Sequence, residues 1–148
     1  MIVALKKEHW PDIEAIMPMV YQDDTTGVVA LDDTTGEFLG AVVCEDWTES
    51  MCSCHILLKD PFRALRAGLH NALADYVFVQ AGRIKVMGLV PANNLRAQRL
   101  NRHFGFTELF RIEDGYKVGE DYVVMEMKKE NCPYWAEVKN GQESSQAA

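Results

Sequence analysis

Two arginines and a glycine stand at the start of a predicted helix, and their chemistry suits the binding of an anion. Asp60 can cap this helix and Pro61 can occupy its first position. The first turn of a helix presents unpaired backbone N–H groups and the positive end of the dipole, which favour a phosphate group. Arg63 and Arg66 lie in that turn, and Gly68 follows them. The structural alternative is that both arginines are solvated residues of an ordinary amphipathic helix.

The elements around this turn are predicted from hydrophobic spacing. An apolar run predicts a strand over 51–58, and the apolar spacing after Pro61 predicts a single helix to Val79, the longest in the chain. A branched apolar run predicts another strand over 84–90. That strand must end at Pro91, because proline cannot donate to a following ladder.

The remaining C-terminal elements follow a helix and a hairpin pattern. Asn93 or Asn94 is a suitable N-cap for a helix that ends before Gly105. Alternating apolar residues then predict strands over 107–113 and 121–127, joined by a loop.

The N-terminal part predicts a short strand, a helix from Trp10 that Pro18 ends or bends, and a hairpin. The sequence Asp-Asp-Thr-Thr-Gly occurs at 23–27 and again at 32–36, before a strand over 38–44. We interpret both copies as turns. A calcium loop is less favoured, because the acidic residues do not alternate as such a ligand loop requires.

Length, composition and charge limit the class of protein. The chain has 148 residues, of which 48% are hydrophobic, and this predicts one domain with a sizeable core. Its formal net charge of -7 argues against binding to nucleic acid or to an anionic membrane surface. The sequence shows neither a secretory leader nor an apolar run of about 18 residues, so we expect a cytoplasmic protein.

The cysteines predict no metal site. Cys44, Cys52, Cys54 and Cys132 form no C-x-x-C pair, and three of them lie in apolar runs. Buried free thiols are therefore favoured over disulfides or zinc ligands.

Two motifs resemble a known family. The pattern N-x-x-A-x-R-L-x-x-x-x-G-F, from Asn94 to Phe106, resembles the segment after the fifth strand of the GNAT superfamily of acyl-CoA-dependent N-acetyltransferases. The segment from Arg63 to Gly68 resembles the cofactor loop of that family, Q/R-x-x-G-x-G/A, but Arg66 replaces its middle glycine. Glycine there lets the backbone approach a phosphate closely, so Arg66 either pairs with the phosphate or blocks it.

The resemblance implies the fold and the domain organisation. We expect an α/β (α+β) fold, with a mixed, mainly antiparallel central sheet of six to seven strands and helices on both faces. A single domain would span 1–137, and the polar sequence over 138–148 predicts a flexible tail.

The resemblance also implies acetyl-CoA, or another acyl-CoA, as cosubstrate. Its pantetheine arm would lie between the fourth and fifth strands, where these splay apart. The implied cofactor-binding residues are Leu57, Leu58, Arg63, Ala64, Leu65, Arg66, Ala67, Gly68, Asn94 and Asn101.

The implied reaction is acyl transfer to a primary amine of a small molecule or protein, by direct attack in a ternary complex. Many members of the family place an acidic tyrosine where this chain has Asn101, whose amide does not titrate. His55, Glu49 and Tyr116 are substitutes, although each alone is better explained as a structural residue. Acidic residues near the last loop could attract a cationic amine.

Two alternatives stay open. Arg66 and Asn101 favour a non-catalytic structural or binding protein of the same fold, which has lost the use of acetyl-CoA. A homodimer is compatible with either function.

Overall fold

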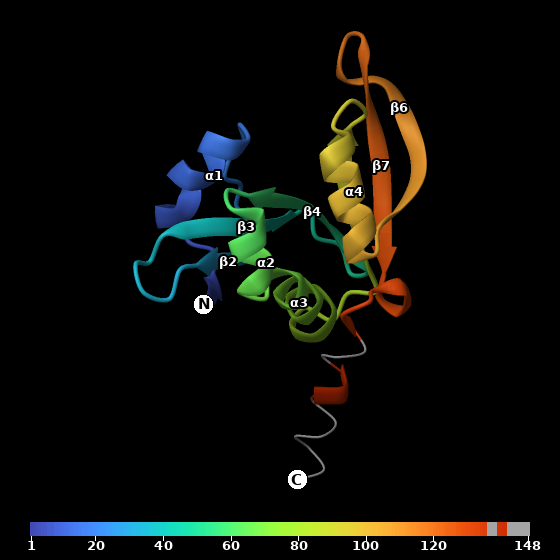
Figure 1. The fold of residues 1–148 in the computed structure, drawn as a ribbon. Helices are drawn as coiled ribbons and strands as arrows, with labels where there is room; N and C mark the ends of the chain where they lie inside the picture. The colour runs from blue at the N-terminus through green and yellow to red at the C-terminus, as the bar shows by residue number, and fades with distance from the viewer. Residues whose placement is uncertain (136–138, 142–148) are drawn as a thin grey trace.

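The computed structural model describes residues 1–135 and 139–141. Its centre is a seven-stranded sheet in the order β1-β2-β3-β4-β5-β7-β6 (Figure 1). Neighbouring strands are antiparallel except β4 and β5, which are parallel. This confirms the mixed, mainly antiparallel sheet. The strands are β1 (Ile2–Ala4), β2 (Thr26–Leu31), β3 (Phe38–Glu45), β4 (Met51–Leu58), β5 (Lys85–Pro91), β6 (Thr107–Lys117) and β7 (Glu120–Lys128).

Helices cover both faces of the sheet, as predicted. On one face α1 (Trp10–Ile16) buries Trp10 and Ile13 against residues of β2 and β3. On the other face α2 (Pro61–Arg66), α3 (Leu69–Ala74) and α4 (Leu95–Phe104) share one larger core. Short helical segments lie at Lys7–His9 and Lys129–Asn131.

The single helix predicted from Pro61 to Val79 is wrong. The backbone of Gly68 is left-handed, with φ 92°, and it separates α2 from α3. A glycine adopts this conformation without a Cβ clash, so the chain can end one helix and begin another there. A π-helical segment, Asp75–Gln80, then follows α3 directly. Among the described residues α4 is the longest α-helix.

The closing hairpin is longer than predicted, because most of the expected loop is strand. β6 continues to Lys117 and β7 begins at Glu120, so Tyr116 lies on a strand. Side chains hold this tip together. The Asp114 backbone N–H donates to Asp121 Oδ1 at 3.0 Å, and the Gly119 N–H donates to Asp114 Oδ1 at 2.7 Å.

Strands β4 and β5 separate after a short contact. Their parallel pairing covers only Met51 with Lys85, Cys52 with Val86, and Ser53 with Met87. β4 nevertheless continues to Leu58 and β5 to Pro91. The two strands therefore diverge in their second halves.

The four cysteines are free and buried, as predicted. No group of side chains suited to a metal ion occurs among the described residues. In the same part of the chain, no helix is both long and apolar enough to span a membrane. The tail predicted over 138–148 lies outside the described residues, except for 139–141, which are helical.

Candidate functional site

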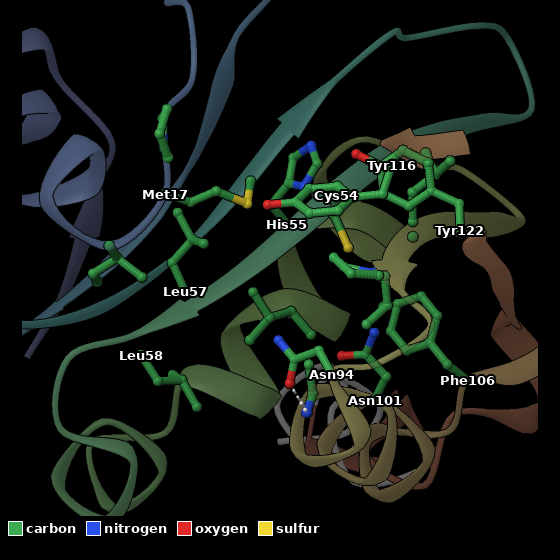
Figure 2. A pocket seen from close by; sticks show the side chains of 18 residues that line it. Met17, Cys54, His55, Leu57, Leu58, Asn94, Asn101, Phe106, Tyr116 and Tyr122 are labelled. Atoms are coloured by element: carbon green, nitrogen blue, oxygen red, sulfur yellow. Dashed lines mark hydrogen bonds between the residues drawn. The ribbon is translucent and has the colours of Figure 1, made fainter. Parts of the chain in front are cut away.

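A cavity of about 320 Å³ lies where β4 and β5 diverge. Figure 2 shows His55, Tyr116 and Tyr122 on one side of it and Asn94 and Asn101 of α4 on the other. Residues Ile16 to Pro18, at the end of α1, also line it. The structure thus collects residues from both ends of the chain around the gap in the sheet.

His55 lines this cavity and has an acidic partner. Its Nε2 atom lies 3.1 Å from Oε1 of Glu45, and the two side chains are only 20% and 13% exposed. His55 pairs with Val43 across the β3–β4 hairpin, so Glu45, two residues further along β3, lies on the same face of the sheet. A neutral histidine that donates its Nε2–H to a carboxylate keeps Nδ1 as a proton acceptor.

Of the other proton-transfer candidates, the structure brings Tyr116 to the cavity and leaves Glu49 away from it. Tyr116 and Tyr122 both line the cavity, with their rings edge to face at 5.6 Å. Glu49 is exposed in the turn between β3 and β4, and it is not among the residues that line the cavity. Glu45 is the carboxylate beside His55, and sequence reasoning missed it.

Helix α4 contributes two asparagines. Asn94 caps the helix, because its Oδ1 accepts the Ala97 backbone N–H at 3.0 Å, as predicted. Asn101 is buried, and its amide nitrogen lies 3.8 Å from the sulfur of Met125, a weak acceptor. Both asparagines line the cavity, so each can hydrogen-bond a molecule bound there.

A second hollow, of about 550 Å³, adjoins the cavity, and several positively charged side chains line it. We call it the cationic hollow. The two share the lining residues Ile56, Leu58, Asn94 and Ala97. Lys59, after β4, and Arg96 and Arg99, on α4, line the second hollow. Sequence analysis did not predict this cluster, although Arg96 and Arg99 have the i, i+3 spacing of one helix face.

The predicted cofactor loop has a different environment. Arg63 Nη2 lies 2.6 Å from Asp32 Oδ2, and its Nη1 lies 3.1 Å from Glu37 Oε2. The Asp60 carboxylate accepts the Arg63 backbone N–H at 3.1 Å, so an anion already occupies the start of α2. The Thr35 backbone N–H and the Arg63 guanidinium hold the pKa of Asp32 well below its usual range.

Arg63 and Arg66 instead line a third hollow, of about 410 Å³, beside the β2–β3 turn. Of the predicted cofactor residues, Leu57, Leu58, Asn94 and Asn101 line the cavity between β4 and β5. Ala64 is fully buried in the core. None of the residues from Arg63 to Gly68 lines the cavity or the adjoining cationic hollow. The role of this segment in cofactor binding stays a prediction.

The sheet order, the splayed β4 and β5 and the helices on both faces are those of the GNAT fold. Solved structures of the spermidine/spermine N-acetyltransferase SpeG from Vibrio cholerae are similar to this chain. One has 16% sequence identity and a TM-score of 0.71, over 86% of this chain and 91% of that chain. A structure of mutant forms of SpeG has 16% identity and a TM-score of 0.74, over 93% and 98% of the two chains.

Comparisons of sequence add no closer relationship. No protein-family model matches this chain, and no curated protein matches it. The structural likeness at this identity confirms the predicted fold.

Proposed function

We propose that this protein transfers an acyl group, most simply acetyl, from acyl-coenzyme A to a primary amine by direct attack in a ternary complex. The observation that carries the proposal is the cavity between the diverging β4 and β5, which His55 lines and which adjoins a cationic hollow. The SpeG proteins of the same fold are named as spermidine N-acetyltransferases, which supports this class of reaction.

The residues present suit an acyl-CoA. The pantetheine arm would lie between β4 and β5, against Leu57 and Leu58, with the amides of Asn94 and Asn101 as hydrogen-bonding groups. The phosphates would lie beside Lys59, Arg96 and Arg99, because guanidinium and ammonium groups pair with phosphate oxygens. The bound acyl-CoA supplies the thioester that the amine attacks.

His55 would receive the proton of the attacking amine. Glu45 orients the imidazole and stabilises the positive charge that it acquires. Tyr116 and Tyr122 line the same cavity, and a tyrosine hydroxyl group can hydrogen-bond the sulfur that leaves. Asn101 can donate an N–H to the same region, but it cannot transfer a proton.

Direct attack is favoured over an acyl-enzyme on a cysteine. Cys54 is the cysteine that lines the cavity within the described part of the chain. Burial, with Cys52 nearby, raises the pKa of the Cys54 thiol well above its usual range. The thiol therefore stays protonated near neutral pH and is a poor nucleophile.

The test is mass-spectrometric detection of the N-acetylated product after incubation of the protein, acetyl-CoA and a panel of primary amines. Product should form with the wild-type protein and should fall sharply with His55→Gln. If acetyl-CoA binds but no amine in a broad panel is acetylated, the non-catalytic alternative gains support.

We also propose that the protein forms a homodimer through β6. This strand lies at the edge of the sheet, and all its residues are exposed, including the apolar Phe110 and Ile112. An exposed apolar edge strand pairs readily with a second chain. Light scattering should give twice the monomer mass, and Phe110→Lys should reduce it; a wild-type monomer at high concentration would contradict this proposal.

A further inference from the structure

The acceptor end of the cavity is apolar and aromatic. Ile16, Met17 and Pro18 line it from the end of α1, and Tyr116 and Tyr122 line it from the closing hairpin. Among the described residues that line the cavity there is no aspartate, glutamate, lysine or arginine. His55 is the one histidine in that set.

Four acidic side chains of β3 and the closing hairpin have partners within the protein. Glu45 contacts His55 at 3.1 Å. At the hairpin tip, Asp121 accepts the backbone N–H of Asp114, and Asp114 accepts that of Gly119. Glu120 lies 3.7 Å from Lys117. These carboxylates stabilise the protein itself and do not form a row of acceptors along the cavity.

This lining separates two classes of amine by their charge. A polyamine has further ammonium groups a few methylenes from the reacting nitrogen, and each would need a carboxylate or water when it enters an apolar cavity. A monoamine has one ammonium group, which loses its proton before it attacks. The tyrosine rings can contact both that ammonium group and an apolar body.

We infer that the acceptor is a compact primary monoamine with an aromatic or otherwise apolar body, and not a polyamine. This inference rests on the proposed acyl transfer. The cavity volume of about 320 Å³ suits the thioester end of the donor together with a compact acceptor. The SpeG proteins of the same fold are named for spermidine, so the inference separates this chain from them in substrate.

The experiment compares 2-phenylethylamine with spermidine at saturating acetyl-CoA, with kcat/KM as the measured quantity. We expect the ratio to favour 2-phenylethylamine by at least about tenfold, because the apolar body is buried and no second charge is desolvated. Equal or better use of spermidine, or better use of a lysine-containing peptide, would overturn the inference.

A pair of variants at Met17 tests the charge argument directly. Met17 lines the cavity and is partly exposed, and Met17→Glu adds a carboxylate there. Met17→Gln is the matched control of similar size without charge. Met17→Glu should move the ratio toward spermidine by about tenfold relative to Met17→Gln. An unchanged ratio, with both variants folded, would contradict the inference.

A binding measurement separates this inference from the proposed function. In an NMR titration, 2-phenylethylamine should shift the resonances of Tyr116 and Tyr122 at a lower concentration than spermidine does, whether or not turnover occurs. Failure of acetyl-CoA to bind would sink the acyl-transfer proposal and leave the amine preference to this binding test. Preferential binding of spermidine, with acetyl-CoA bound, would sink the inference alone.

Discussion

Helix α2 follows β4 and helix α4 follows β5, and both helices have arginines close to their start, but Arg63 of α2 has carboxylate partners that the α4 arginines lack in the described part of the chain. Arg63 of α2 contacts Asp32, Glu37 and Asp60. Arg96 and Arg99 of α4 line the cationic hollow, and neither forms an ion pair within the described residues. The caps differ too, since Asp60 is charged and Asn94 is neutral.

The difference teaches that arginines at a helix start do not by themselves identify an anion site. A guanidinium that already contacts carboxylates has its hydrogen bonds satisfied, whereas one that lines a hollow has donors available for phosphate. We therefore expect changes at the start of α2 to affect folding, and changes on α4 to affect binding of acyl-CoA.

The largest effect is expected from His55, which lies away from both helix starts. His55→Gln should lower kcat/KM by about 10² to 10³-fold, within the usual contribution of general acid–base catalysis of about 10² to 10⁴. Acetyl-CoA affinity should change little. Steady-state kinetics with calorimetry measures both quantities. A loss beyond about 10⁴-fold with normal folding would show that proton transfer, and not positioning, dominates the reaction.

The next effect is expected from the α4 arginines. Arg96→Ala/Arg99→Ala should weaken acetyl-CoA binding by about 10- to 100-fold, because two charge-assisted contacts to phosphate are lost at an exposed site. The matched control, Arg63→Ala/Arg66→Ala, should change affinity by less than about threefold. The reverse order of effects would support the loop from Arg63 to Gly68 as the phosphate site.

The cap of α4 gives a smaller effect, on stability. Asn94→Ala should lower the free energy of unfolding by about 0.5 to 2 kcal/mol, as expected for a lost N-cap. Asn94→Asp should keep a free energy of unfolding close to that of the wild-type protein, because aspartate is also a good N-cap. Urea unfolding checks both. If Asn94→Asp is as unstable as Asn94→Ala, the capping account is wrong; if it is stable but binds acetyl-CoA poorly, Asn94 also contacts the cofactor.

The smallest effect concerns stability in acid and depends on Asp32, the residue of the β2–β3 turn that contacts Arg63 of α2. The folded pKa of Asp32 is lower than its unfolded value, so ionised Asp32 stabilises the protein above the unfolded pKa of about 3.9. This stabilisation is lost as the pH falls through the folded pKa. Asp32→Asn should therefore flatten the decrease in stability below about pH 4. Unfolding midpoints between neutral and acidic pH test this, with Asp33→Asn as the control.

Most of the fold could be predicted because its signals are local. Strand β4 has the predicted bounds of 51–58, since turn residues and Asp60-Pro61 delimit an apolar run. The signals that predicted the cap at Asn94 and the left-handed Gly105 at the other end of α4 were also local. The break at Gly68 was missed, because the helical spacing of apolar residues continues through it.

The candidate site was only partly predictable, because its partners are distant in sequence. Glu45 meets His55 through the register of a hairpin, which the sequence does not specify to the residue. Arg63 meets Asp32 across 31 residues, so its availability for phosphate could not be judged from its position on a helix. Asn94 and Asn101 belong to the same helix, α4, and both line the cavity, so local spacing was enough to predict that they lie together. Their contact with a cofactor stays a prediction.

The most direct test of the central claim is calorimetric titration of acetyl-CoA into the wild-type protein, with thermal unfolding at the same cofactor concentrations. We predict saturable binding with a dissociation constant between about 1 µM and 1 mM, in the range of enzyme substrates. Ligand at about 100 times that constant should stabilise the protein by about 2.7 kcal/mol. No heat and no shift in the unfolding temperature at millimolar acetyl-CoA would contradict the account.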